Sequence, residues 1–288
     1  MPLTDRQRAR EQRARANWTP PGPLPTGPGD DPTLSPGEGE TLDAFAGHWR
    51  VFQLAGGHRY STDDLLAAWY ARVCQTDLGN EPRRLLDLGS GIGSVALLLA
   101  WAFPTLQVMG LEVQPTSLGL ARRSARYNGV ADRVTFELGD LREPPDLGTF
   151  DLVTGSPPYW DPAAGTVATG PQKGPCRFEF HGGVASYARA AARFLAPGGL
   201  AAFVFDGRQR LRFEAAIAAV DLALVRTRDV ISREGDGPLL LLAACRRPGE
   251  APGLVEREEP LLLRHRDGSR SEEFRRLRAM MGFPPGPC

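Results

Sequence analysis

The sequence predicts an α/β fold in which a mostly parallel sheet of seven strands, ending in an antiparallel hairpin, is covered by helices on both faces. Two observations predict it. Short apolar segments typical of strands alternate along the chain with longer segments typical of helices, and this alternation builds a parallel sheet between two helical layers. A short turn at residues 234–237 joins the last two strand segments. We expect these two to pair antiparallel, because a parallel return needs a long crossover.

The expected strands are apolar runs bounded by turn residues. They lie at 84–88, 106–111, 134–138, 150–154, 200–205, 222–231 and 239–245. An additional hairpin is expected before them. It would use the alternating segment 49–54, the turn Gly56-Gly57, and a return strand at Arg59-Tyr60.

The helices are marked by caps and helix breakers. Ser61 or Thr62 caps a first helix that continues to about residue 73. Pro104 ends the second helix, and Pro115 with Gly129 bounds the third. The helices after the first are expected at 94–103, 115–128, 184–195 and 211–220.

The composition restricts the function classes. The 288 residues carry 34 basic and 34 acidic side chains, so no global field indicates nucleic acid or a membrane. No apolar run is long enough to span a bilayer. Four cysteines lie far apart without a Cys-x-x-Cys pair, which predicts a reduced, cytoplasmic protein without a metal site.

Four parts are expected along the chain. Residues 1–40, with arginines from Arg6 to Arg15 and then many prolines and glycines, predict a disordered tail. Residues 41–80 would form the hairpin and helix that pack on the main domain, 81–248 the α/β domain, and 249–288 a C-terminal extension. The arginines at both ends fit either an arginine-rich composition or contact with RNA.

A glycine-rich turn follows the strand at 84–88. Its glycines stand at 89, 91 and 93 and let backbone amides and a helix N-terminus approach a ligand. The dinucleotide pattern G-x-G-x-x-G would need glycine where this chain has Ser94, and Asp87 would repel a pyrophosphate. The sulfonium and ammonium groups of S-adenosyl-L-methionine fit an acidic turn better.

Acidic residues also end the next two strands. Glu112 is placed to accept both ribose hydroxyls, and Asp140 to reach the adenine amino group. Three acids at successive strand ends, in register with the glycine turn, favour a cofactor site over solvated strand ends. The predicted cofactor-binding residues of these segments are Asp87, Gly89, Ser90, Gly91, Gly93, Glu112, Val113, Asp140 and Leu141.

The segment Ser156-Pro157-Pro158-Tyr159 ends the fourth strand, beside the crevice where open α/β sheets bind ligands. A side-chain oxygen on Ser156 and the carbonyl of Pro157 would accept both N–H bonds of a planar amine, while Tyr159 stacks on its ring. A rigid loop is the alternative interpretation of Pro-Pro. Trp160 either extends the stacking surface or packs the loop.

These residues resemble the class I S-adenosyl-L-methionine-dependent methyltransferases, a Rossmann-like family with a seven-stranded sheet. Within it the chain is similar to the bacterial tRNA adenine-N6 methyltransferases that modify position 37 of a valine tRNA. The similarity runs from about Phe52 to beyond Leu263. It is carried by the (N/S)PPY motif and by residues 57–66, 87–93, 110–114, 121–128, 139–142, 177–179 and 260–263.

The resemblance implies that Arg59, Thr62 and Asp63 help to close the cofactor pocket. One position departs from the family, which has asparagine where this chain has Ser156. Ser-Pro-Pro-Tyr is typical of cytosine-N4 DNA methyltransferases, although those often order their motifs differently and carry a target-recognition domain for which this chain has little room. The difference concerns the target base more than the reaction.

Three functions are therefore considered. The first is methyl transfer to an exocyclic amine, most simply adenine N6 in tRNA, by a monomeric enzyme. The second is transfer to a protein glutamine amide, cytosine N4 or a small-molecule amine. The release-factor glutamine enzymes hold the amide with a similar Pro-Pro-Tyr segment, but they carry a helical N-terminal domain. The third is a cofactor-binding or RNA-binding protein whose active site is no longer catalytic.

Overall fold

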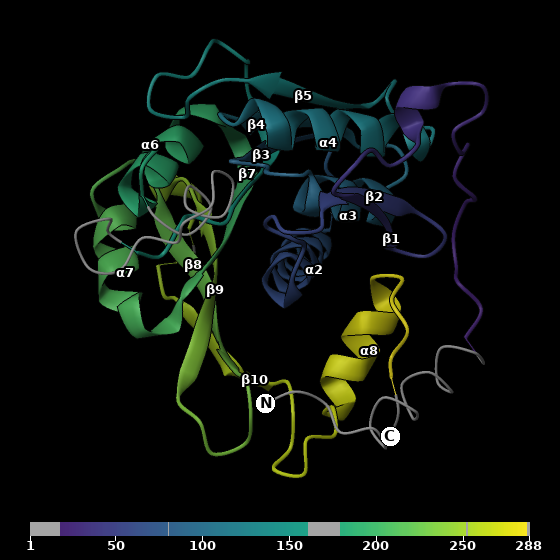
Figure 1. The fold of residues 1–288 in the computed structure, drawn as a ribbon. Helices are drawn as coiled ribbons and strands as arrows, with labels where there is room; N and C mark the ends of the chain where they lie inside the picture. The colour runs from purple at the N-terminus through teal and green to yellow at the C-terminus, as the bar shows by residue number, and fades with distance from the viewer. Residues whose placement is uncertain (1–17, 80, 161–178, 252, 287–288) are drawn as a thin grey trace.

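The computed structural model describes residues 18–79, 81–160, 179–251 and 253–286. Its main sheet has eight strands in the order β10-β8-β9-β7-β6-β3-β4-β5 (Figure 1). Their bounds are β3 (Arg84–Leu88), β4 (Gln107–Glu112), β5 (Val134–Leu138), β6 (Phe150–Gly155), β7 (Leu195–Asp206), β8 (Ala223–Ile231), β9 (Pro238–Arg246) and β10 (Glu256–Leu262). The seven predicted strands of this sheet are all present.

The pairing of the strands confirms the predicted fold class. β3 pairs parallel with β4 and β6, β4 with β5, and β6 with β7. β9 pairs antiparallel with both β7 and β8, because only a short turn separates it from β8. The carboxyl ends of β3, β4, β5 and β6 therefore lie at one edge of the sheet.

Two helical layers cover the sheet (Figure 1). One face carries α2 (Thr62–Asp77), α3 (Ser94–Ala102) and α4 (Pro115–Tyr127), and the other carries α6 (Val184–Phe194) and α7 (Arg210–Ala218). Neighbouring strand residues point into opposite cores: Leu85 and Leu152 pack on the first face, and Leu86 and Val153 on the second. All four side chains are fully buried, as expected of a parallel sheet covered on both sides.

The start of α2 is fixed by its own sequence. Ser61 is the N-cap; its hydroxyl accepts the amide of Asp63 at 3.2 Å, and the carboxylate of Asp64 accepts the amide of Ser61 at 2.7 Å. This reciprocal capping satisfies two amides that a helix start leaves unpaired. No helix within the described ranges is long and apolar enough to span a membrane.

The predicted N-terminal hairpin is wrong in its pairing. β2 (Arg50–Leu54) pairs with β1 (Glu40–Ala44), which precedes it, and not with Arg59-Tyr60. The turn between them is closed by two hydrogen bonds, from the Phe45 amide to the Trp49 carbonyl and from the Trp49 amide to the Ala46 carbonyl, each 3.0 Å long. The amide of Tyr60 instead donates to the Gln53 side chain at 2.7 Å. The alternation at 49–54 predicted a strand correctly, but it did not identify the partner of that strand.

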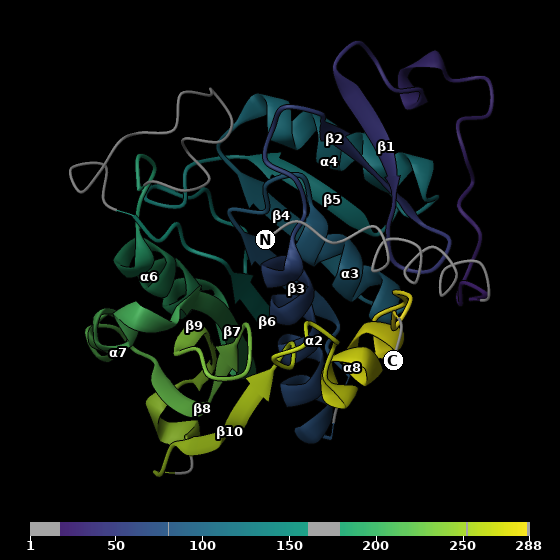
Figure 2. The ribbon, with the colours of Figure 1, turned by 60° about the horizontal axis from the view of Figure 1, so that its bottom comes forward.

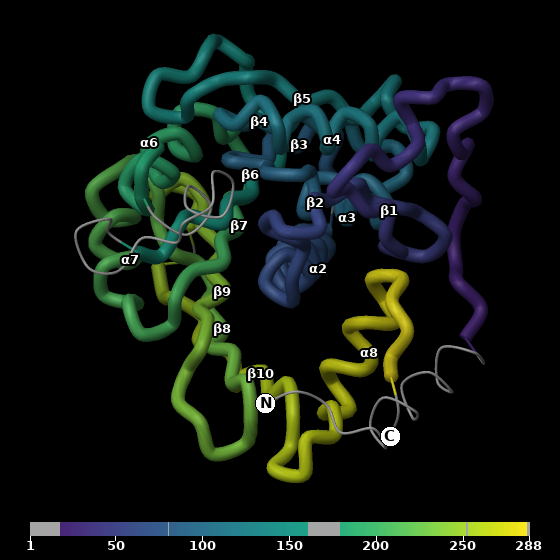
Figure 3. Tube along the Cα trace, viewed as in Figure 1, coloured from purple at the N-terminus to yellow at the C-terminus, as the bar shows by residue number. Residues whose placement is uncertain are grey.

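The segment before residue 40 also differs from the expectation of a disordered tail, over the part that the structure describes. Residues 18–39 run along the outside of α3 and α4 (Figures 2 and 3, purple) and include a short helix, η1 (Pro32–Leu34). The amide of Gly27 donates to the carbonyl of Tyr127 at 2.9 Å. The stretch from Arg6 to Arg15 lies outside the described residues.

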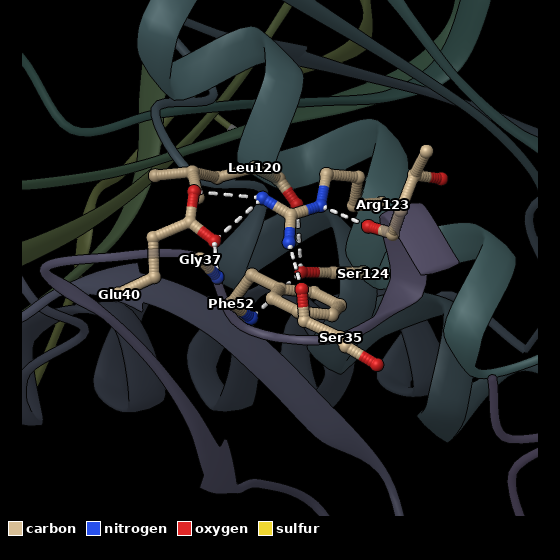
Figure 4. A network of polar contacts seen from close by, with 8 residues as sticks. Ser35, Gly37, Glu40, Phe52, Leu120, Arg123 and Ser124 are labelled. Atoms are coloured by element: carbon tan, nitrogen blue, oxygen red, sulfur yellow. Dashed lines mark hydrogen bonds and ion pairs between the residues drawn. The ribbon is translucent and has the colours of Figure 1, made fainter. Parts of the chain in front are cut away.

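One arginine of α4 attaches this segment to the domain (Figure 4). Arg123 donates to both carboxylate oxygens of Glu40 at 2.7 and 2.8 Å, and to the carbonyls of Thr33 and Ser35 at 2.7 and 2.9 Å. Its guanidinium lies 4.2 Å from the ring centroid of Phe52. A proline-rich segment forms few backbone hydrogen bonds of its own. The Arg123 side chain therefore supplies donors to backbone carbonyls that have no partner within the segment.

The C-terminal extension adds an eighth strand that was not predicted. β10 pairs parallel with β8 at the edge of the sheet, and its register shifts between Glu258 and Leu261 (Figure 2). Pro260 lies within this shift. Proline and charged residues are tolerated on an edge strand, which explains why the apolar pattern did not reveal it. The last helix, α8 (Glu272–Met280), packs beside β10.

Candidate active site

A cavity of about 370 Å³ lies at the carboxyl ends of the central strands. The glycine-rich turn after β3 and the end of β4 form one part of its wall. The Ser-Pro-Pro-Tyr segment after β6 and the first turn of α2 form another. Two motifs separated by more than sixty residues in the sequence therefore line the same space.

The glycines of the turn are required by its backbone. Gly89, Gly91 and Gly93 have φ of 61°, 57° and 82°, in the left-handed region that favours glycine. A Cβ on Gly89 would lie 2.0 Å from the hydroxyl of Tyr187. A Cβ on Gly91 would have no neighbour within 4 Å, because this residue borders the open cavity.

Glu112 connects the end of β4 to this turn. One carboxylate oxygen accepts the amide of Gly91 at 2.8 Å, and the other accepts the amide of Gln114 at 2.8 Å. The side chain is buried, and burial raises its pKa despite these hydrogen bonds. Glu112 thus fixes the shape of the glycine-rich turn in addition to lining the cavity.

Further carboxyl groups gather beneath and beside the cavity. Asp87 accepts the hydroxyl of Thr154 at 2.8 Å through Oδ1, while its buried Oδ2 and the buried Oγ of Ser90 have no hydrogen-bond partner among the described residues. Burial, and then the charges of Asp64 and Glu112, raise the pKa of Asp87 to about 7.

The first turn of α2 adds two more carboxyl groups. Burial raises the pKa of Asp64 to about 6, and burial together with the neighbouring Asp64 raises that of Asp63 to about 6. No arginine or lysine of the described chain lines the cavity. Within the described ranges, no three His, Cys, Asp or Glu side chains converge to hold a metal ion. The cavity therefore suits an organic cation.

The other end of the cavity is formed by Ser156 to Trp160. The hydroxyl of Tyr159 donates to the carboxylate of Asp63 at 3.4 Å and lies close to the Ser156 side chain. The Tyr159 ring packs edge to face on Phe205, with centroids 5.5 Å apart. Burial, and then the Asp63 charge, raise the pKa of Tyr159 well above its ordinary value, so the phenol stays neutral.

Most of the predicted site residues line this one cavity. They are Asp63, Gly89, Ser90, Gly91, Glu112, Val113, Leu141, Ser156, Pro157, Pro158, Tyr159 and Trp160. The predicted Arg59, Thr62, Asp87, Gly93 and Asp140 are not among the lining residues. Arg59 forms an ion pair with Asp43 at 2.9 Å, and Asp140 forms one with Arg142 at 2.5 Å.

Sequence reasoning missed several residues that line the cavity. They are His58, Ser61, Asp64, Gln114, His181 and Tyr187. Ser61 and Asp64 are recognisable in the sequence as a helix cap, but a cap does not indicate that it faces a ligand. Tyr187 lies in α6 and His181 just before it, and only the tertiary structure brings them to the strand ends.

The sequence of the central strands matches a known family. Residues 85–164 match the family described as methyltransferase domain. These residues include β3, the glycine-rich turn, β4, and the Ser-Pro-Pro-Tyr segment. The chain contains a class I methyltransferase domain. S-adenosyl-L-methionine is the cofactor of such a domain.

Three curated relatives are similar to part of this chain. The tRNA1(Val) (adenine(37)-N6)-methyltransferase of Porphyromonas gingivalis is 34% identical over 35% of this chain and 41% of its own length. The ribosomal protein uL3 glutamine methyltransferase of Bradyrhizobium diazoefficiens is 38% identical over 35% and 32%. The release factor glutamine methyltransferase of Geobacter sulfurreducens is 43% identical over 26% of each. The chain thus spans less than half the length of these relatives.

The fold is similar to that of solved methyltransferases. A predicted O-methyltransferase from Agrobacterium tumefaciens superimposes with a TM-score of 0.58 at 18% identity, over 77% of this chain and 97% of that one. A putative class I S-adenosylmethionine-dependent methyltransferase from Listeria monocytogenes gives 0.52 at 13% identity, over 70% and 68%. At these identities the similarity concerns the fold alone.

The residues of the cavity fit S-adenosyl-L-methionine. Its ammonium and sulfonium groups carry positive charge, and no arginine or lysine of the described wall neutralises the buried carboxyl groups. The unpartnered Oδ2 of Asp87 and Oγ of Ser90 offer hydrogen-bonding atoms to an ammonium group or to a water beside it. The open space over Gly91 admits a ligand close to the backbone.

We expect the affinity for S-adenosyl-L-methionine to rise with pH between about 5 and 8. The pKa values of Asp63 and Asp64, raised to about 6, and of Asp87, raised to about 7, make these groups neutral at the lower end and ionised at the upper end. Only the ionised forms attract a cationic ligand. Calorimetric titration at a series of pH values measures this effect.

The stability of the unliganded protein is expected to change in the opposite direction. The three aspartates hold their protons more tightly in the folded state, with pKa values above the ordinary 3.8. Their contribution to stability is therefore fully present below the unfolded pKa of 3.8 and is lost as pH rises from there through the folded pKa values of about 6 to 7. A melting temperature that rises over this range, or a cofactor affinity independent of pH, would contradict this account of the cavity.

Proposed function

We propose that the chain is an S-adenosyl-L-methionine-dependent N-methyltransferase that methylates an exocyclic amine, most simply adenine N6 in tRNA. One observation supports this most strongly: the Ser-Pro-Pro-Tyr segment and the acidic, glycine-rich turn line one cavity. A cavity lined by the glycine-rich turn alone would be compatible with many different reactions of S-adenosyl-L-methionine. The adjacent segment of small polar residue, two prolines and tyrosine adds a place for a flat, amine-bearing acceptor.

S-adenosyl-L-methionine, when bound, supplies a methyl group on a positively charged sulfur. Glu112, Ser90, Gly91 and Val113 would hold it by contact with the ribose and the main part of the molecule. Asp63 and Asp87 would balance its positive charge, Asp87 from behind the glycine turn. Leu141 and, in a supporting role, Asp140 would border the adenine.

The acceptor amine needs positioning because its lone pair is delocalised into the ring. We propose that the Ser156 hydroxyl and the Pro157 carbonyl accept its two N–H bonds, and that the Tyr159 ring stacks on the base. Burial fixes Pro157 and Pro158 in place. No strong base is required before transfer, and the proton released from the methylated nitrogen passes to solvent or to Asp63, which lies 3.4 Å from the Tyr159 hydroxyl.

A second acceptor is favoured by two of the relatives. The proteins from B. diazoefficiens and G. sulfurreducens carry glutamine methyltransferase in their names, and a glutamine amide presents the same planar NH₂ group as adenine. The adenine proposal is supported by the P. gingivalis relative and by the segment 57–66, which resembles the tRNA enzymes. A cytoplasmic location, a monomeric state and the four-part domain division remain predictions.

The test is a transfer assay with isotopically labelled S-adenosyl-L-methionine and three acceptors: bulk bacterial tRNA, a protein extract depleted of nucleic acid, and single-stranded DNA. We expect label in tRNA, and N6-methyladenosine in its nuclease digest by mass spectrometry. Label only in protein, recovered as methylglutamine, would favour the second acceptor. Calorimetric cofactor binding without transfer to any acceptor would instead indicate a protein that binds the cofactor but lacks the chemistry.

A further inference from the structure

A short turn at the end of β7 contacts the acceptor end of the cavity from outside. It is the helical turn η3 (Gly207–Gln209), which follows Asp206, the last residue of β7. β7 is the parallel neighbour of β6, which carries the Ser-Pro-Pro-Tyr segment. The residues of η3 therefore emerge beside that segment, although fifty residues of sequence separate Gln209 from Tyr159.

Asp206 is the anchor of this turn. Its side chain is 2% exposed. It accepts the backbone amide of Arg208 at 3.0 Å, the Arg208 guanidinium at 2.9 and 2.7 Å, and the Gln209 amide at 3.3 Å. Burial alone would raise the pKa of Asp206, but these hydrogen bonds and the arginine charge outweigh it and hold the pKa below its ordinary value. A buried carboxylate with this many donors is a rigid support.

Gln209 extends from this support to the acceptor segment. Its Nε2 donates to the backbone carbonyl of Tyr159 at 2.8 Å, and its Oε1 accepts a guanidinium hydrogen of Arg212 at 3.1 Å. With a donor on one side and an acceptor on the other, the orientation of the amide is determined by its neighbours. Gln209 therefore fixes the backbone at the residue whose ring is proposed to stack on the substrate.

The same turn contacts the residue after Tyr159. The Arg208 guanidinium, anchored on Asp206, lies 5.5 Å from the ring centroid of Trp160. Neither Asp206, Arg208 nor Gln209 lines the cavity. Any influence of these residues on the reaction must act through Tyr159 and Trp160, which do line it.

We propose that Gln209, supported by the buried Asp206, is a positioning residue that holds the Tyr159 backbone in the place required for methyl transfer. The inference rests on the proposed function of the Ser-Pro-Pro-Tyr segment. Transfer reactions are sensitive to such placement, and a displacement of about 1 Å costs roughly 100-fold in rate. Loss of one hydrogen bond to Tyr159 changes the acceptor geometry and leaves the cofactor end, across the cavity, unchanged.

The main test variant is Gln209→Leu, which keeps the approximate size of the side chain and removes its donor. We expect kcat to fall about 10-fold or more, with the affinity for S-adenosyl-L-methionine within about 2-fold of the wild type. Gln209→Lys restores a donor that can reach the Tyr159 carbonyl and pair with Asp206, but it loses the acceptor for Arg212, and it is expected to recover part of kcat. The matched control is Leu211→Ala, two residues along and 80% exposed, which should leave kcat unchanged.

Hydrogen exchange provides a readout that does not depend on the acceptor. In Gln209→Leu the peptide that contains Tyr159 and Trp160 should exchange faster, while the peptide that contains the glycine-rich turn keeps its protection. Unchanged exchange around Tyr159 would overturn the proposal. So would wild-type kcat in Gln209→Leu, or a parallel loss of kcat, cofactor affinity and melting temperature that Gln209→Lys does not reverse.

The two proposals fail in different ways. If the wild type transfers methyl groups to protein and not to tRNA, the Gln209 variants are compared on that protein, and a selective loss of kcat still supports the positioning role. If the wild type binds the cofactor and methylates nothing, the proposed function and the catalytic role of Gln209 fall together. Wild-type transfer with an unaffected Gln209→Leu variant overturns the positioning role alone.

Discussion

Replacing Tyr159 by alanine is expected to lower kcat/KM for the acceptor by roughly 5- to 150-fold, the equivalent of the ~1–3 kcal/mol that base stacking on an aromatic ring contributes. The ring has a defined position, packed edge to face on Phe205 and lining the cavity. Tyr159→Phe keeps the ring and loses only the hydroxyl that contacts Asp63 and Ser156. We therefore expect this second variant to retain most of the activity. Steady-state kinetics at saturating cofactor measure both effects.

Variants of Ser156 test the proposed hydrogen bond to the acceptor amine separately from the stacking on Tyr159. Ser156→Ala removes the proposed acceptor of one amine N–H, and its kcat should fall with little change in cofactor affinity. Ser156→Asn introduces the residue that the resembling tRNA enzymes carry, and should preserve transfer to the same base if the serine is a substitute for asparagine. Turnover unchanged in Ser156→Ala but abolished in Tyr159→Ala would show that the serine has no part in the clamp.

Replacing Glu112 by glutamine is expected to weaken S-adenosyl-L-methionine binding by about 10- to 100-fold, or roughly 1.4–2.7 kcal/mol. Both carboxylate oxygens accept backbone amides, from Gly91 and Gln114. A glutamine can accept only one of these, because its NH₂ group would face the other amide donor to donor. The glycine-rich turn must then move, and one acceptor for the ribose is lost. Calorimetric titration measures the dissociation constant.

A matched control for Glu112 is available on the neighbouring strand. Glu137 lies on β5 and is exposed, so Glu137→Gln makes the same chemical change without a buried partner. It should bind the cofactor as the wild type does. Equal affinities for Glu112→Gln and the wild type would show that the carboxylate neither shapes the turn nor contacts the cofactor.

The fold follows from the sequence where local signals and burial agree. The central strands are apolar runs with both faces buried, so each could be recognised without its neighbours. Their parallel pairing followed from the helices between them, and the antiparallel β8–β9 pair from its short turn. The edges of the sheet were harder. β10 contains proline and several charged residues, so it lacks the apolar pattern of a strand. The pairing of β1 with β2 depends on the turn that ends at Trp49, which the pattern of neither strand indicates.

The sequence by itself determined the local features from which the candidate site is built. Glycines in the left-handed region, acidic residues at strand ends and Ser-Pro-Pro-Tyr after a strand are local features, because each depends on the backbone of its own segment. The tertiary structure decided which of them share a cavity. It placed the first turn of α2 beside the Ser-Pro-Pro-Tyr segment and brought Gln209 to the Tyr159 carbonyl. Such contacts join residues far apart in the chain, and their partners are set by sheet order and helix packing, which no local pattern encodes.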